Sequence, residues 1–343
     1  FNTSNRTIRL NTVCKCRNIN FSPDVAGIFL DSRPGGFLQV YGSAVFGANA
    51  KLVYAEIDMC SNTLSTKTFS YAGADKIPVL IERYSTLTLQ SNIYVHDIRL
   101  QGGSIDFNEY DVTVDVFTIT STTAGFDATN SILTVNFGLD IPRETNVCTF
   151  TGSTVIMNGT TLSAQSQVFN NIEFKNTASI TGSNTFADIK LTSGKTLTVE
   201  AGSTQTITSL TGNGTKAQPI TLKSSSVGTY FTLSKTSETV EVDRYIIQDC
   251  KATGGAIFIA TNSKAIGVTS GWNIIAPQAE ITYKDSIFTH SDIVEGRCNT
   301  QHALAGESLA YDTLDFTIWS DTAIEFTQGD PLDFYFDEEL INK

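Results

Sequence analysis

The feature that most constrains the fold is a short repeat that runs from about residue 168 to residue 210. Three apolar positions recur with a constant offset (186 − 169 = 17): Phe169, Ile172 and Phe174 are followed by Phe186, Ile189 and Leu191. The next counterpart of Ile189 is Leu210, after 21 residues (210 − 189 = 21). A repeat of this size is too short for helical repeats and is typical of one coil of a β-solenoid.

The same rhythm can be followed towards the N-terminus. The segment Ser91–Leu100 has the apolar pattern V-x-x-I-x-L, and Val116–Ile119 matches its first half at a spacing of 21 residues (119 − 98 = 21). Two short apolar stretches, 105–107 and 112–114, lie between them. Three short strands per coil, with alternate side chains pointing inward, predict a right-handed parallel β-helix over residues 81–276.

The composition and the flanking segments complete the predicted fold class, which is all-β. Only 17% of the residues are charged, and the Thr, Ser and Asn residues between the apolar runs disfavour helices and suit strands and turns. Residues 1–80 are β-rich but irregular, and we expect an N-terminal cap or opening module. After the break at Pro277, the longer alternation of 310–319 predicts an antiparallel β domain at 277–343, whose completeness stays open. Trp272 is expected to cover the last coil.

Charge and cysteine usage exclude several classes of function. The net charge is −12 with a pI near 4.7, and Lys and Arg form no cluster, so we expect no nucleic-acid binding. No apolar run reaches the roughly 18–20 residues that span a bilayer, so we expect no membrane insertion. The six cysteines contain no CxxC pair, which argues against a metal site. Most of them are predicted to be buried free thiols, with a sparse disulfide framework as the alternative.

A search for catalytic residues finds no assembled motif. The position before the repeating isoleucine is occupied by polar residues, which we interpret as an exposed polar ladder: Asp97, Thr118, Asn171, Asp188 and Ser209. The three histidines each stand alone in the sequence: His96, His290 and His302. We therefore predict no catalytic residue, no metal site and no cofactor, and the ligand-binding residues stay unknown.

Four further polar stretches have plain structural interpretations. Asp243 and Asp249 flank a strand, and Asp249 with Lys251 has the pattern of surface charge. The Asn-Gly-Thr triplets at 158–160 and 213–215 match glycosylation acceptors, but they are also tight turns in a Thr-rich coil, which we favour.

Two long stretches resemble known families. The run from about residue 190 to 275, from LTSGKTLTVEAGSTQTITSL to SGW, resembles the pectate-lyase-like β-helix of virion and tail proteins of bacteriophages and of some bacterial surface proteins. Residues 281–343 resemble the opening of hub or tail-tip domains in phages of Gram-positive hosts. The matching motifs are Ser291-Asp292-Ile293 and Gly329-Asp330-Pro331-Leu332-Asp333-Phe334-Tyr335, while Glu338 stands where the family usually has Gly.

These resemblances imply a function and a location. They imply a structural or adhesion component of a phage tail tip or baseplate, located in the virion. Its β-helix arm, mounted through the C-terminal domain, would contact the host surface without catalysis. The implied partners are other virion tail proteins and host cell-surface polysaccharide, and the implied assembly is a homo-oligomer, with a trimer favoured. Two alternatives stay open: a polysaccharide lyase or glycoside hydrolase on the same β-helix, and an extracellular adhesin on a bacterial surface.

Overall fold

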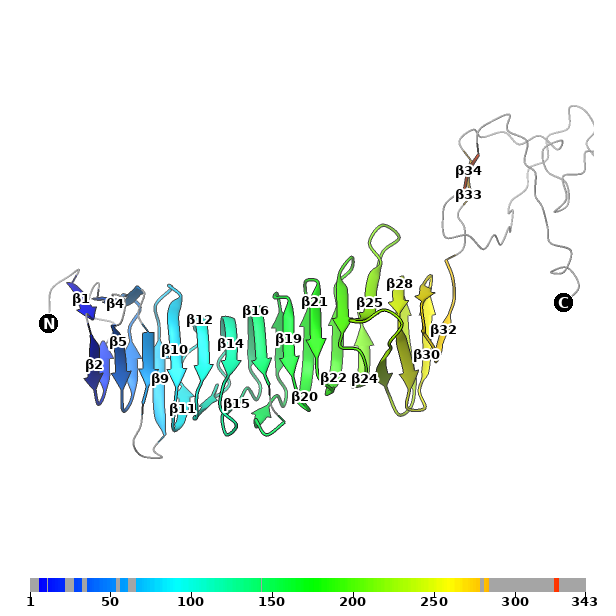
Figure 1. The fold of residues 1–343 in the computed structure, drawn as a ribbon. Helices are drawn as coiled ribbons and strands as arrows, with labels where there is room; N and C mark the ends of the chain where they lie inside the picture. The colour runs from blue at the N-terminus through cyan, green and yellow to red at the C-terminus, as the bar shows by residue number, and fades with distance from the viewer. Residues whose placement is uncertain are drawn as a thin grey trace, which may run out of the picture. The chain divides into compact units, whose positions relative to one another are not determined.

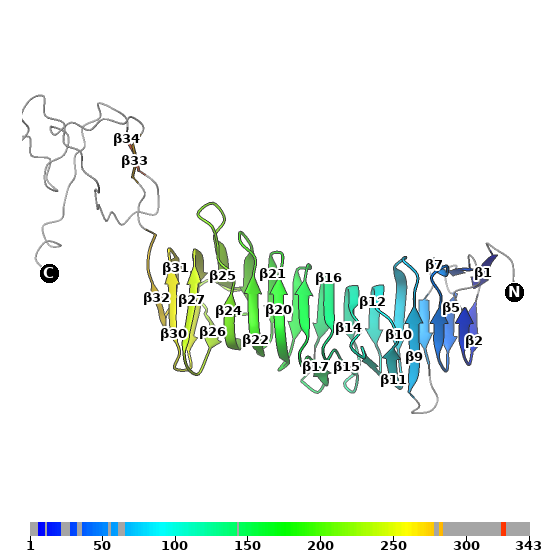
Figure 2. The ribbon, with the colours of Figure 1, turned by 180° about the vertical axis from the view of Figure 1, so that it is seen from behind.

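A computed structural model describes residues 6–277, except residues 11, 22–27, 33–35, 54–55, 61–65 and 143, together with two short strands at 281–283 and 324–326. The chain divides into two compact units, Phe1–Ile275 and Ala276–Lys343. The described residues contain strands and turns and no helix. The first unit is a right-handed parallel β-solenoid of about 12 turns, whose strands stack side by side in chain order (Figures 1 and 2).

Each coil consists of three strand segments, which we name face 1, face 2 and face 3 in the order in which the chain visits them. Face 1 contains β1 (Arg6–Leu10), β4 (Ile28–Ser32), β7 (Lys51–Val53), β18 (Thr154–Met157), β27 (Thr239–Asp243), β30 (Ile257–Thr261) and β32 (Trp272–Ile274). Face 2 contains β2 (Val13–Cys16), β5 (Phe37–Val40), β8 (Glu56–Met59), β19 (Thr161–Ala164), β21 (Ala178–Thr181), β23 (Thr196–Val199), β25 (Ile220–Ser224), β28 (Tyr245–Gln248) and β31 (Lys264–Ile266). Face 3 contains β3 (Ile19–Phe21), β6 (Ala44–Phe46), β9 (Lys67–Tyr71), β11 (Thr86–Leu89), β13 (Ser104–Asp106), β15 (Gly125–Asp127), β17 (Cys148–Thr149), β26 (Phe231–Ser234) and β29 (Cys250–Thr253).

Several strands bend round a corner and belong to two faces. β10 (Ile77–Glu82), β12 (Ile93–Leu100), β14 (Val112–Ile119) and β16 (Ile132–Ile141) run from face 1 into face 2. β20 (Val168–Phe174), β22 (Asn184–Leu191) and β24 (Thr204–Thr211) run from face 3 into face 1 of the next coil. The two halves of β16 show the branching, because its first half pairs with β18 and its second half with β19. The predicted three segments per coil are present, and many of them are joined in pairs.

The repeat at residues 168–210 is confirmed, and one of its predicted extensions towards the N-terminus is wrong. Phe169 pairs with Phe186 and Ile189 pairs with Leu210, at the predicted offsets of 17 and 21 residues. Upstream, however, Ile98 pairs with Phe117 at an offset of 19 (117 − 98 = 19). The comparison of Ile98 with Ile119 matched residue identity, whereas the register follows the inward positions of the pattern. The coil there is therefore two residues shorter than predicted.

The interior of the stack is filled by apolar side chains, with aromatic rings in contact from coil to coil. Phe169 lies 4.4 Å from Phe150 and 5.1 Å from Phe186, measured between ring centroids, and Phe126 lies 5.2 Å from Phe150. At β32, the last strand of the first unit, the ring of Trp272 packs edge-on against Phe258, with 5.0 Å between the ring centroids. Parallel strands that bury one face in this way are stabilised mainly by removing apolar area from water.

The segments on either side of residues 81–276 agree only in part with the predicted domains. β2, β5 and β8 join the face 2 ladder directly to β10, so solenoid pairing extends ahead of residue 81. In the second unit, β33 (Ile281–Tyr283) pairs with β34 (Ile324–Phe326) in parallel. The 310–319 alternation, the turn before residue 332 and the Ser291 motif lie outside the described residues, so the antiparallel domain stays a prediction.

The cysteines are free thiols wherever the structure describes them, and Cys298 lies outside that part. Cys60 and Cys250 are buried, whereas Cys14, Cys16 and Cys148 are partly buried. Cys14 and Cys16 alternate with the exposed Lys15 and so point to the same side of β2. Burial raises the pKa of Cys148 to about 12, so this thiol stays protonated near neutral pH.

Candidate functional site

The corner between face 1 and face 2 gathers polar side chains from successive coils. Within a regular strand, side chains alternate between the two sides, but the alternation breaks where β12, β14 and β16 bend. In β14 the break is a register shift between Val114 and Val116, and it leaves the Asp115 side chain only 5% exposed. A buried carboxylate requires partners, because an unpaired charge there is costly.

Asp115 has three side-chain partners from three other coils. Lys76 Nζ lies 2.7 Å and His96 Nδ1 lies 2.6 Å from Asp115 Oδ2, and Asn136 Nδ2 donates to Oδ1 at 2.9 Å. Burial by itself raises the pKa of Asp115, but the hydrogen bonds from Lys76, Asn136 and His96 outweigh it, so this pKa lies below its usual value. The carboxylate is therefore ionised at neutral pH and ties four coils together.

The row continues along the stack through asparagine side chains. Asn158 Nδ2 donates to Asn136 Oδ1 at 3.1 Å, and Asn176 Nδ2 donates to the backbone oxygen of Asn158 at 2.8 Å. We call this row the polar corner, and its members are Lys76, His96, Asp115, Asn136, Asn158 and Asn176. One side chain per coil creates a continuous line of donors and acceptors parallel to the stack.

Two exposed aromatic rings lie along the polar corner. Lys76 Nζ lies 4.3 Å from the centroid of the Tyr94 ring, which is a cation–π geometry. Phe137 follows Asn136 at the bend of β16 and is 59% exposed. A large exposed aromatic side chain on a surface that otherwise carries Thr, Ser and Asn marks a candidate contact point.

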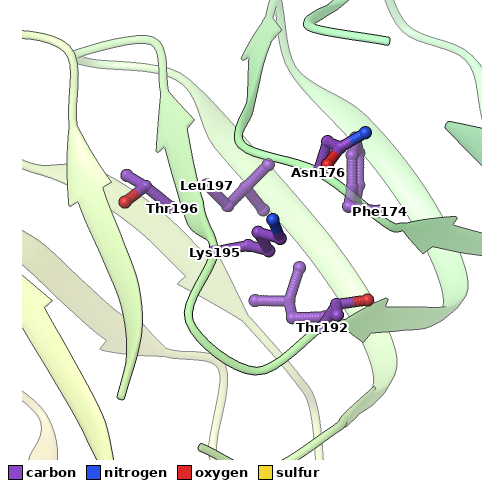
Figure 3. A pocket seen from close by; sticks show the side chains of 7 residues that line it. Phe174, Asn176, Thr192, Lys195, Thr196 and Leu197 are labelled. Carbon is purple, nitrogen blue, oxygen red and sulfur yellow. The ribbon is translucent and has the colours of Figure 1, made fainter. Parts of the chain in front are cut away.

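The polar corner ends at a shallow depression of about 160 Å³. Its lining is drawn in Figure 3 and consists of Phe174, Asn176, Leu191, Thr192, Lys195, Thr196 and Leu197. Enclosed small-molecule pockets usually measure about 300–1,000 Å³. The depression is open to solvent and encloses no cavity of that kind, so any ligand here lies on the surface.

The chemistry available at the polar corner is recognition through hydrogen bonds. Asp115 holds the Nδ1 side of His96, and the imidazole is 56% exposed. This contact fixes the ring orientation, as a carboxylate does for a histidine in many sites. Within the described residues, no group of three His, Cys, Asp or Glu side chains could hold a metal ion. In the same part of the chain, no helix is long and apolar enough to cross a membrane.

The residues predicted to form a polar ladder divide between separate places. Asn171, Asp188 and Ser209 are register partners on face 1, and Ser209 donates a hydrogen bond to Asp188. Asp97 pairs with Val116 instead, and Thr118 pairs with Asp140. The prediction of one ladder that contains all five residues is therefore wrong. The reason is that the coil between Asp97 and Thr118 is two residues shorter than expected.

The other polar residues singled out in the sequence have mixed outcomes. Asp249 is not surface charge, because it has no exposed area and accepts the backbone N–H groups of Val268 at 2.8 Å and Gly228 at 3.2 Å. His96 has a carboxylate partner that the sequence did not suggest, while His290 and His302 lie outside the described residues. Both Asn-Gly-Thr triplets lie in connections between strands, at 158–160 between β18 and β19 and at 213–215 between β24 and β25.

Sequence reasoning did not find Asp115, the central residue of the polar corner. Its partners lie 39, 19 and 21 residues away. The only local signal is the pair of adjacent apolar residues Val116-Phe117, where the alternation of Val112, Val114 and Val116 changes phase to Phe117 and Ile119.

Two aspartates also occupy matching positions on face 3. Asp106 of β13 and Asp127 of β15 are register partners on neighbouring coils. Asp106 accepts the backbone N–H of Asn108 at 2.8 Å, and Asp127 accepts that of Thr129 at 2.9 Å. Each carboxylate thus holds the turn that follows its own strand.

No family model, no curated protein and no solved structure matches the sequence or the fold.

Proposed function

We propose that this protein is a structural and host-contacting component of a bacteriophage tail tip or baseplate that acts without catalysis of its own. The observation that supports it best is the uninterrupted parallel pairing from β10 to β31 along face 2. Such a stack forms a stiff arm, because each coil packs only on its two neighbours and buries its apolar side chains there.

The proposal assigns different roles to the two units. The solenoid is the arm that reaches the host surface, and residues 277–343 attach it to the other tail proteins. The arm works as a homo-oligomer, with a trimer as the expected form. The resemblance of the sequence to phage virion proteins supports this assignment, and so does the acidic, Thr- and Ser-rich surface.

The test is to find the chain in virions. Mass spectrometry of purified particles should detect it, and gold-labelled antibody against the solenoid should mark the tail end in electron micrographs. Native mass spectrometry of the purified chain should give the mass of a trimer. Particles that lack the chain would refute the proposed location.

A second candidate function is cleavage of a polysaccharide, and the Asp106–Asp127 pair favours it. Glycoside hydrolases use two carboxylates, about 5–5.5 Å or about 6.5–9.5 Å apart, and carboxylates on neighbouring coils can approach such separations. Release of reducing ends from host cell-wall polymer, lost in both Asp106→Asn and Asp127→Asn, would establish this activity. Equal release by the wild type and both variants would assign it to another site.

A further inference from the structure

We propose that the polar corner, with Tyr94 and Phe137, binds a neutral glycan that lies along the solenoid axis. This inference rests on the proposed host-contacting function and deepens it, because it names the site on the arm and the chemistry of its partner.

The shape of the site selects an extended polymer. The polar corner presents one side chain from each successive coil, and parallel strands are about 4.8 Å apart. The depression at the end of the row is open to solvent and does not enclose a ligand. A chain of sugar residues, whose repeat is comparable to the coil spacing, can contact several coils at once.

The charges of the site select a neutral polymer. Lys76 and Asp115 pair at 2.7 Å, and beside them Arg99 Nε donates to Asp97 at 2.7 Å. The two positive groups beside Asp115, Lys76 and Arg99, are thus matched by carboxylates and form no basic patch for an anionic sugar. The whole chain carries a net charge of −12, which repels polyanions at long range.

The side chains fit sugar chemistry. Each amide of Asn136 and Asn158 uses one N–H within the row, and an amide has a second N–H and two oxygen lone pairs. Together with the exposed imidazole of His96, these groups match hydroxyl groups, which also donate and accept. The rings of Phe137 and Tyr94 provide flat apolar surfaces for the C–H faces of pyranose rings. Aromatic side chains combine such area with little loss of conformational entropy.

A peptide fits the same corner less well. Extended peptides usually bind by adding a strand to a sheet edge with free backbone groups. At this corner the backbone is already paired, since Asn158 and Gly159 N–H donate to the Val135 oxygen and Thr160 N–H donates to the Phe137 oxygen. Recognition must therefore run through side chains.

The experiment measures binding of the full chain to immobilised hexasaccharides of glucose, galactose, rhamnose and N-acetylglucosamine. An acidic oligogalacturonate and an extended peptide of Gly and Ser serve as comparison surfaces. We expect retention on at least one neutral glycan and on neither comparison surface. Retention on no neutral glycan, or stronger retention on the acidic glycan or the peptide, overturns the proposal.

A matched pair of variants locates the site. Phe137→Ala should weaken glycan binding roughly tenfold, whereas Tyr84→Ala should leave it unchanged. Tyr84 is also 59% exposed, but it follows the C-terminal end of β10 (Ile77–Glu82), whereas Lys76 precedes its N-terminal end. Because both side chains are on the surface, neither substitution should unfold the protein, and equal melting curves verify this. His96→Ala provides a second variant within the site. Equal binding by wild type and Phe137→Ala refutes the assignment. Virions with Phe137→Ala should still contain the chain, so this failure is separate from failure of the proposed function.

Discussion

At the scale of single residues, the solenoid contains buried charged side chains that are stable there only because they are paired with opposite charges. Lys67 and Glu82 are almost fully buried, and Lys67 Nζ lies 3.2 Å from Glu82 Oε2. Lys67 also donates to the Met59 oxygen at 2.6 Å, and Glu82 accepts the Ser85 N–H at 3.0 Å. Burial raises the pKa of Glu82, and the nearby Lys67 opposes this. The pair is fully hydrogen-bonded, as a buried ion pair must be to persist.

Removing one charge of this pair should lower the free energy of unfolding more than removing both charges. Lys67→Met leaves a buried carboxylate without its cation, so the free energy of unfolding should fall by about 3–5 kcal/mol. The double variant Lys67→Met/Glu82→Gln should recover much of that loss, because Gln keeps an acceptor and carries no charge. Denaturant unfolding measures both. A double variant less stable than the single one would contradict this account.

Asp115 should make the stability depend on acid. Its pKa is lower in the folded chain than its ordinary value of 3.8, so the folded state favours the ionised form. Its contribution is therefore fully present above pH 3.8 and is lost as the pH falls through the folded pKa. The stability difference between wild type and Asp115→Asn, followed by thermal melts from neutral pH to about pH 3 and below, should shrink on acidification. A difference that stays constant with pH would contradict the prediction.

At the scale of elements, the closeness of adjacent coils limits which residues a strand can contain. Gly125 begins β15, and a Cβ placed there would overlap the carbonyl oxygen of Val147 in the next coil. Gly138 in β16 is a natural comparison, because a Cβ there would lie 3.8 Å from the nearest atom, the Thr161 oxygen. Both glycines lie in strands, so backbone contact distinguishes them.

Alanine at these two glycines should therefore have different effects. Gly125→Ala forces the backbone of two coils apart and should lower the free energy of unfolding by about 1–3 kcal/mol. Gly138→Ala should change it by no more than about 0.5 kcal/mol. Urea unfolding compares the two, with circular dichroism to verify the strand content. Equal losses would mean that the approach of Val147 does not limit position 125.

The aromatic stack is the element-scale feature that joins coils through the interior. Phe169→Ala removes a ring that contacts Phe150 on one side and Phe186 on the other, so we expect a loss of about 3–5 kcal/mol. Phe169→Leu fills most of the space and should cost less. Calorimetric melts of both variants measure the difference, and equal losses would show that the cavity is not the cause.

At the scale of the whole molecule, the division at residue 275 separates a unit with its own interior from the residues that follow. The buried apolar cluster runs from Leu38 to Ala260 and lies entirely within the first unit. A unit with its own core can fold alone.

A chain that ends at Ile275 should therefore fold without the second unit. Its far-ultraviolet circular dichroism should show β-structure, and its melting temperature should stay within a few degrees of that of the full chain. A matched truncation after Leu191 cuts the stack in the middle of its ladder and exposes a coil, so it should be less stable. Failure of the Ile275 truncation to fold would show that the second unit is needed.

The amino-acid sequence by itself determined the coil, its inward apolar positions and the all-β class. Alternation along a strand is a local property, so Phe169, Ile172 and Phe174 already mark the buried side of β20. The free state of the described cysteines also followed from their sparse spacing. These predictions needed no knowledge of which coil lies next to which.

Only the tertiary structure decided the register between coils, and with it the candidate site. Coil length varies, since Val155 pairs with Ile172 after 17 residues and Leu133 pairs with Val155 after 22. The turns absorb this variation, and their lengths cannot be inferred from the strand pattern. Asp115 therefore meets Lys76 and His96 through stacking alone. Polar contacts between coils depend on the sum of all intervening turns, whereas the apolar pattern depends on each strand separately.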